Sequence, residues 1–427
     1  DTAALGSGAE LWHVEQSDLP LVELRLWLPG GSLGDPAGDR GLTRLADHLV
    51  LFGAGDRDAA AFAATTEQLA IDMDVSTWEG GTVVSVGCHA DRLDDALDLL
   101  ADVVLRPRFD REDVERERDL QIAEIERAVD DPRTAAAWTA NRLWYGEAHP
   151  AAHPSIGVAD ELADIDAKKV RSSWSSRAKP SGARFVAVGA VAKDDLVARL
   201  DARFGEWTGA GPAAKKFPAP AGVEAGPRLV FVDAPGSSQS VLRVTLPGWT
   251  ASDDALAAAE LGGIVLGGTF TSRLNRLLRE EKGYTYGARA RVYGSRHDGV
   301  VIASTNVRGD VTGPALADLL GELERITEGV DAAERDKAFG AARTRAIETM
   351  GTRSGLAGAL VGATSDGQGP DAVPAALAAA AAADEAAVDA AMADIDLSKA
   401  LVVVVGDLEA VRAQVEEAVP GDWIVAE

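Results

Sequence analysis

Alternating apolar and polar residues predict strands in two distant parts of the chain. Val22–Ser32 alternates in this way, and Val241–Thr250 repeats the pattern. Successive side chains of a strand point to opposite faces, so this alternation is typical of a strand with one buried face. We therefore predict a half-buried strand in each stretch.

Three segments of the first half recur in the second half at offsets between 217 and 220 positions. The matching pairs are Pro29 with Pro247, Ala96–Val104 with Ala315–Leu323, and Arg184–Leu200 with Ala400–Val415. Three matches at nearly one offset indicate two homologous domains in tandem.

The segment between the repeats, residues 211–227, is rich in Gly, Pro and Ala and has no apolar period, which is typical of a linker. It separates an N-terminal domain (1–210) from a C-terminal domain (228–427). Each domain mixes alternating strands with amphipathic helices, which predicts an α+β fold with a mainly antiparallel sheet packed with helices. The alanine-rich run Ala372–Met392 is predicted to be plain helix.

The chain is strongly acidic, with 68 acidic and 42 basic residues among 427 and a formal net charge of −26. Such a surface repels phosphate backbones and anionic lipid, so we expect neither a nucleic-acid partner nor a membrane span. The single cysteine, Cys88, excludes an internal disulfide and is expected to be buried. Because the sequence starts at Asp1 rather than Met, a removed signal and a periplasmic location are favoured slightly over the cytoplasm.

A helix predicted near residue 42 carries Arg44, Asp47 and His48 on one face. Its opposite, apolar face consists of Leu42, Leu45, Ala46, Leu49 and Val50. Two histidines at i and i+4 with an acid between them present two zinc ligands and a general base from one helix. The inverted zincin order is H-x-x-E-H, and here it reads R-x-x-D-H. A purely structural alternative is an i, i+3 ion pair between Arg44 and Asp47.

A second helix is predicted within Phe109–Pro132, where Glu117 and Glu124 lie two turns apart on one face. Glu124 follows His48 by 76 positions, which makes this glutamate pair relevant to the first helix.

With these motifs the sequence resembles the pitrilysin and insulin-degrading enzyme family of inverted zincin metallopeptidases, especially its short form, which includes mitochondrial processing peptidase. The resemblance runs through Gly41–Gly55, Ala90–Asp110, Glu115–Ile125, His149–Ile165 and Gly267–Gly287. It implies that the chain forms one half of a metallopeptidase clamshell. It also implies that His48 matches the second zinc histidine, Glu124 the distal glutamate ligand and Glu117 its supporting acid.

Two departures from the family pattern alter the expected chemistry. Arg44 stands where the first zinc histidine belongs, and Asp47 stands where the catalytic glutamate belongs. A guanidinium stays protonated and cannot donate a lone pair to a metal. The remaining ligands, His48 and Glu124, do not make a three-ligand catalytic site. We therefore expect a degenerate zinc site and no metal in this chain.

The second domain has an arginine and a tyrosine at the spacing of two residues that contact the substrate in the family it resembles. Ser272–Gly283 is predicted to be a helix ending at Gly283, and Tyr284–Val292 a strand. The resemblance implies that Arg279 and Tyr286 hold the substrate backbone and stabilise the tetrahedral intermediate, since both donate hydrogen bonds to an oxygen that gains negative charge. Alternatively, Arg279 only complements the helix dipole and Tyr286 is a half-buried side chain.

A degenerate zinc site beside a retained Arg/Tyr pair predicts a non-catalytic, substrate-holding subunit of a heterodimeric zinc peptidase. Its partner would be a homologous chain with intact H-x-x-E-H, zinc would lie in that partner, and peptides would be the substrates. One alternative is a structural or peptide-binding scaffold without a catalytic role, and another is an autonomous peptidase with altered metal ligation.

Overall fold

The computed structural model describes residues 1–212, 217, 220 and 228–426. Most of the expected linker, residues 211–227, lies outside these described residues. The chain forms two compact units, and each unit takes one segment from the opposite half of the sequence. The first unit contains Asp1–Glu126, His153–Lys216 and Glu348–Ala372, and the second contains Arg127–Ala152, Phe217–Ile347 and Val373–Glu427. This division differs from a single cut between residues 210 and 228.

The first unit is built on a six-stranded sheet with the order β1-β2-β8-β3-β7-β6. Its strands are β1 (Thr2–Ala4), β2 (Glu10–Glu15), β3 (Leu21–Pro29), β6 (Asp72–Thr77), β7 (Gly81–His89) and β8 (Arg184–Gly189). β2 and β8 run parallel, and the other neighbours run antiparallel. The short strands β4 (Gly53–Ala54) and β5 (Arg57–Asp58) form a separate pair. The sheet is therefore mainly antiparallel, as predicted.

The second unit repeats the order and direction of five of these strands in the sheet β11-β12-β10-β13-β9-β14. The sixth strand differs, because β14 comes last in the sequence and runs parallel to β9, whereas β1 comes first and runs antiparallel to β2. Its strands are β9 (Leu229–Asp233), β10 (Gln239–Pro247), β11 (Ala288–Gly294), β12 (Gly299–Arg308), β13 (Leu401–Gly406) and β14 (Trp423–Val425). β3 and β10 both end at a proline, and β8 and β13 both end at a glycine, at the offsets found in the sequence. The two homologous tandem domains of α+β class are thus confirmed.

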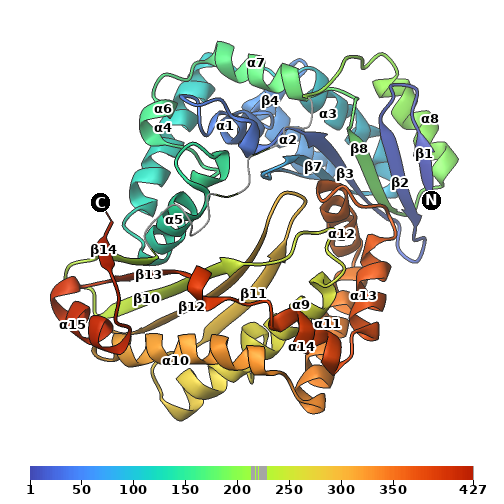
Figure 1. Cartoon of the computed structure of the whole chain (residues 1–427). Helices are drawn as coiled ribbons and strands as arrows, with labels where there is room; N and C mark the ends of the chain where they lie inside the picture. Colours follow the sequence, from blue (N-terminus) through green and yellow to red (C-terminus); the bar gives the residue numbers. More distant parts are fainter. Residues whose placement is uncertain (213–216, 218–219, 221–227, 427) are drawn as a thin grey trace. The chain divides into compact units, whose positions relative to one another are not determined.

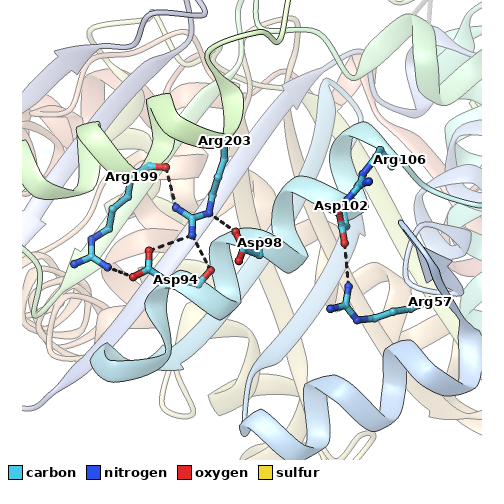
Figure 2. Close-up of polar contacts among 7 residues, drawn as sticks. All are labelled: Arg57, Asp94, Asp98, Asp102, Arg106, Arg199 and Arg203. Carbon is cyan, nitrogen blue, oxygen red and sulfur yellow. Dashed lines mark hydrogen bonds and ion pairs between the residues drawn. The ribbon is translucent and has the colours of Figure 1, made fainter.

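The first unit contains several helices besides its strands, and ion pairs join some of these helices to neighbouring elements. The helices are α1 (Leu42–Leu49), α2 (Ala59–Leu69), α3 (Leu93–Leu105), α4 (Arg111–Ala128), α6 (Ala159–Leu162), α7 (Ala167–Arg177) and α8 (Lys193–Phe204). Figure 2 shows arginines of α8 reaching the acidic side of α3: Arg203 contacts Asp94 and Asp98, and Arg199 contacts Asp94. At the other end of α3, Asp102 is shared by Arg57 and Arg106. These contacts fix α3 against α8 and the β4–β5 pair.

The exchanged segments contain two helices, and each packs on the sheet of the unit to which it belongs, although that sheet is built from the other half of the sequence. α5 (Pro132–Tyr145) places Ala136, Ala140 and Trp144 on the apolar side chains of β9, β10 and β13. α12 (Arg353–Ser365) packs Ala357, Leu360 and its neighbours on the first sheet. The residues it covers there are Trp12, Trp27, Val83, Val186 and Val188. Each sheet therefore depends on a helix from the other half of the sequence.

The second unit's other helices lie mainly on the far side of its sheet from α5, and Figure 1 shows α10 running along the strands. They are α9 (Leu256–Gly263), α10 (Thr312–Arg325), α11 (Ala332–Met350), α13 (Ala372–Ala382), α14 (Glu385–Met392) and α15 (Leu408–Ala418), with π-helical segments at Ile264–Gly268 and Asn275–Glu281. The run Ala372–Met392 is helical as predicted, but it is divided into α13 and α14, because the Asp384 side chain caps α14 by accepting a hydrogen bond from the backbone N–H of Ala387.

The chain's cysteine and its helices meet two further expectations. Cys88 is 7% exposed in β7, and burial raises the pKa of its thiol to about 11, so it is a buried core residue. No helix in the described part of the chain combines the length and apolar character needed to cross a membrane.

Candidate functional site

Helix α1 begins at a position fixed by Asp35. The Asp35 carboxylate accepts hydrogen bonds from the backbone N–H groups of Gly41 and Thr43 and from the Thr43 hydroxyl, at 2.9, 3.1 and 2.6 Å. Burial nevertheless raises the pKa of Asp35 to about 6. Gly41 has a φ of 95°, and a Cβ there would lie 2.6 Å from the carbonyl oxygen of Ile156. This position therefore requires glycine.

Asp47 is buried and does not share an exposed face with Arg44 and His48. It is 1% exposed, and its Oδ1 lies 2.8 Å from Nη2 of Arg177 on α7. Its Oδ2 accepts hydrogen bonds from the hydroxyls of Thr77 and Thr82, at 2.8 and 2.6 Å. The expected face and the suggested Arg44–Asp47 ion pair are both wrong. Asp47 has three better donors in the interior, and each lies at least 30 positions away in the sequence.

Arg177 is the residue that sequence reasoning missed. It occupies the buried side of α7 with Val170 and Trp174, at i, i+4 and i+7, and its guanidinium lies 5.6 Å from the centre of a Trp174 ring. It also donates to the Thr82 hydroxyl at 2.8 Å. The sequence did contain a signal for this residue. Arg177 is an arginine at a position of α7 that the helical period assigns to the apolar face, and a buried arginine needs a carboxylate partner.

The other four residues of the degenerate site meet across α1 and α4. Nη2 of Arg44 lies 3.8 Å from Oε2 of Glu124, and Nε2 of His48 lies 3.0 Å from Oε2 of Glu117. The second carboxylate oxygen of Glu117 accepts a hydrogen bond from Nε of Arg116 at 2.9 Å. The structure therefore brings together Arg44, His48, Glu117 and Glu124, and pairs each cation with one glutamate.

This donor set does not fit a catalytic zinc ion. A zinc site needs three uncharged or anionic donors converging on one point, with a fourth position left open. Here the Arg44 guanidinium occupies a ligand position and neutralises Glu124, while Asp47 is held in the interior. Within the ranges that the structure describes, no group of three or more His, Cys, Asp or Glu side chains is placed to hold a metal.

Arg279 and Tyr286 lie at the end of the π-helical segment and in the loop after it. The helix ends at Glu281, and Gly283 adopts a φ of 65°, as expected for a glycine that ends a helix. The predicted strand starts later than expected, at Ala288, because Tyr284–Gly287 form a loop in which Thr285 bonds to Gly287. Tyr286 is 97% exposed, so the half-buried alternative for this residue is wrong.

The guanidinium of Arg279 stacks on a neighbouring ring. Its central carbon lies 3.6 Å from the centre of the Phe270 ring. Its Nη1 is buried and has no hydrogen-bond partner among the described residues. Stacking fixes the plane of the guanidinium, and the buried Nη1 is left as an unsatisfied donor. No hydrogen bond joins Arg279 to Tyr286 in the described structure.

Comparisons with known proteins agree with this fold. Residues 14–148 match the model of insulinase (peptidase family M16), and residues 164–339 match the model of the peptidase M16 inactive domain. An uncharacterized zinc protease of Mycobacterium tuberculosis is 29% identical over 266 residues, which cover 61% of this chain and 59% of that protein. The match thus spans less than two thirds of the relative's length.

Two solved structures share the fold over nearly the whole chain. The peptidase M16 inactive domain from Pseudomonas fluorescens superposes with a TM-score of 0.87 at 24% identity, covering 95% of this chain and 98% of that one. A protease from Helicobacter pylori superposes with a TM-score of 0.86 at 16% identity and the same coverage. With both family models matched in order along one chain, and with the R-x-x-D-H helix in the place of H-x-x-E-H, this protein belongs to peptidase family M16.

Proposed function

We propose that this chain is the non-catalytic, substrate-holding subunit of a heterodimeric zinc metallopeptidase that cleaves peptides. In this proposal a homologous partner with an intact H-x-x-E-H motif binds the zinc, and this chain supplies Arg279 and Tyr286 to that active site. The proposal rests on a difference between the residues of the zinc motif and the Arg279/Tyr286 pair. Arg44, Asp47 and His48 of the zinc motif are all paired within the chain, whereas the Arg279 guanidinium and the exposed Tyr286 phenol make no hydrogen bond among the described residues.

The state of the zinc motif supports the non-catalytic part of the proposal. A general base must reach a water at the metal, and Asp47 is 1% exposed with both carboxylate oxygens engaged. Arg44 adds a positive charge where a ligand is needed. A metal-activated water therefore has neither a complete binding site nor a base in this chain.

The second domain supports the substrate-holding part. Tyr286 lies in a loop with 97% of its surface exposed, so its phenol is accessible to a substrate or a partner chain. Arg279 is held in place by Phe270, and its buried Nη1 has no hydrogen-bond partner among the described residues. Two donors of this kind suit a peptide carbonyl oxygen that gains negative charge in the tetrahedral intermediate.

Kinetics of the assembled enzyme test the proposal. We expect Arg279→Ala or Tyr286→Phe in this chain to lower kcat of the complex by about 100-fold, as for removal of one oxyanion donor, with KM changed less. Arg276→Ala is the matched control, because Arg276 lies one turn earlier on the same segment and makes only a long 3.9 Å contact with Glu281. Unchanged kcat in all three variants would replace the proposal by the scaffold alternative.

Metal analysis separates the remaining alternative. An autonomous peptidase with altered ligation would retain stoichiometric zinc in the isolated chain and lose it on His48→Ala. The subunit proposal predicts no zinc retained by the isolated chain and chelator-sensitive cleavage only when the partner is present.

A further inference from the structure

Three arginines lie on one face of the second sheet, near its edge strand β11. Arg289 and Arg291 alternate along β11 with buried alanines of the core, so both side chains point away from the core and are exposed. Arg289 is in register with Ser304 of β12, which is in register with Arg243 of β10. Neighbouring strands lie about 5 Å apart, so the backbones of Arg289 and Arg243 are about 10 Å apart. We call Arg243, Arg289 and Arg291 the arginine face.

Within the residues that the structure describes, no acidic side chain pairs with the arginine face. Among the described residues, none of the three guanidinium groups has a hydrogen-bond or ion-pair partner, and Nε of Arg243 is buried without one. Burial lowers the pKa of Arg243, because the charged form is not stabilised by a carboxylate. An unpaired, partly buried charge is costly. In a chain with 68 acidic and 42 basic residues, three unpaired arginines on one face indicate that the compensating anion comes from outside.

The first sheet provides an internal comparison, because its strands β8, β3, β7 and β6 correspond in order and direction to β13, β10, β12 and β11. Arg25 of β3 precedes Arg243 by 218 positions and is in register with Ser85, as Arg243 is with Ser304. Arg25 has partners: Glu23 lies 3.3 Å away, and the Ser354 hydroxyl of α12 lies 2.7 Å away. The edge strand β6 places Asp74 opposite Ser85. The fold therefore does not require unpaired arginines at this position, and the two sheets differ in charge at equivalent places.

Within the second unit, Arg289 and Arg291 are the exposed part of the arginine face, whereas Arg243 is largely buried near Tyr145 of α5 and Tyr293 of β11. The helix α5 packs on β13 and β10 of this side through apolar residues, whereas the described helices against β11 lie on its core side. Figure 1 shows β11, β12 and β10 side by side in the second sheet. An extended chain could therefore lie over these strands with its side chains against Arg289 and Arg291.

We propose that the arginine face binds acidic side chains of an extended peptide, so that this subunit selects acidic peptides. The inference rests on the proposed function, in which the chain holds substrate. Alternate residues of an extended peptide are about 7 Å apart on one side, which matches the spacing of Arg289 and Arg291 along β11. Each guanidinium can bind a carboxylate through two parallel hydrogen bonds. Arg289 follows Tyr286 by three residues, at most about 11 Å, so the acidic residues would lie next to the scissile region.

Peptide binding to the full-length chain tests this inference without the partner. The probe is a fluorescein-labelled unstructured peptide in which Glu alternates with Ser, and the reference is the same peptide with Gln in place of Glu. We expect fluorescence anisotropy to show binding of the Glu peptide about tenfold tighter than the Gln peptide, with a difference that shrinks as salt rises. Arg289→Ala combined with Arg291→Ala removes the difference, and Arg276→Ala, which also removes an exposed arginine, leaves it within about twofold.

A third variant distinguishes binding from a structural role. Arg243→Met removes an unpaired charge at similar volume, so we expect a higher thermal midpoint together with weaker binding of the Glu peptide. A lower midpoint would show that Arg243 serves folding. Equal affinity for the Glu and Gln peptides would overturn the inference, and so would heparin or single-stranded DNA binding as tightly as the Glu peptide at the same charge concentration.

The two proposals fail in different ways. A chain that binds the Glu peptide but never stimulates cleavage by any partner refutes the subunit proposal only. An assembled enzyme that cleaves Glu and Gln peptides with equal kcat/KM refutes acidic selection only.

Discussion

The Asp47 carboxylate and the Arg177 guanidinium form a buried ion pair, with 2.8 Å between Oδ1 and Nη2 and at most 7% of either side chain exposed. Asp47 stands at the general-base position of the zinc motif. Here both carboxylate oxygens of Asp47 accept hydrogen bonds that connect α1 with β6, β7 and α7. The residue therefore stabilises the fold and is not placed to act as a general base.

Removal of Asp47 is therefore expected to destabilise the first unit strongly. Asp47→Ala leaves Arg177 charged and buried without a partner, which costs about 3–5 kcal/mol of the free energy of unfolding. Urea denaturation followed by tryptophan fluorescence measures this change. Glu124→Gln is the control at the exposed Arg44–Glu124 pair, and it should change the free energy by less than about 1 kcal/mol. Equal effects at both sites would contradict the assignment.

Zinc affinity should be recoverable by one substitution. Arg44→His places an imidazole one helical turn before His48 and removes the guanidinium that neutralises Glu124. We expect this variant to retain about one zinc ion per chain after dialysis, measured by mass spectrometry of the metal content, because three protein ligands then converge. Hydrolysis should not return, since Asp47 remains tied to Arg177. Arg44→Ala is the control and should retain none, and zinc in that variant would refute the explanation.

The pKa of Asp35 predicts a pH dependence of stability. The folded pKa is about 6 and the ordinary value is 3.8, so between these values the folded state binds the proton that the unfolded state has lost. Stability therefore falls as the pH rises from about 4 to 6, by at most about 3 kcal/mol for this group. Asp35→Asn removes this titration. The stability of the variant relative to the wild type should rise over the same pH range, and a constant difference would contradict the shift.

The exchange of α12 predicts that the N-terminal half does not fold alone. A fragment of residues 1–210 lacks α12 and leaves Trp12, Trp27 and Val83 without cover. We expect it to aggregate or to bind the dye ANS, because an apolar patch of this kind is exposed. Co-expression with residues 211–427 should give a soluble complex. The control is the same fragment joined to residues 348–372 by a flexible linker, which should fold better because it regains α12. A 1–210 fragment that is monomeric and folds cooperatively would contradict the requirement for α12.

The repeated strands could be predicted from the sequence, because alternation is a local signal, but their ends could not: the predicted stretches ran to Ser32 and Thr250, and the strands end at Pro29 and Pro247. The exchange of α5 and α12 could not, because both helices carry ordinary apolar faces that do not specify which sheet they cover. At the site, the resemblance to the family predicted that His48 and Glu117 lie close together. Neither the resemblance nor the sequence pattern predicted that Asp47 is buried. Its partners lie up to 130 positions away, and helical spacing alone placed it on the exposed side.

The central claim is that this chain completes the active site of a zinc-bearing partner. Affinity purification of the full-length protein from its host, with mass spectrometry of the co-purifying chains and peptide cleavage measured with and without chelator, tests it most directly. The account predicts a stoichiometric partner that carries H-x-x-E-H, cleavage that chelator abolishes, and loss of most of that cleavage when the purified chain carries Arg279→Ala. A partner that cleaves peptides at the full rate without this chain would contradict it.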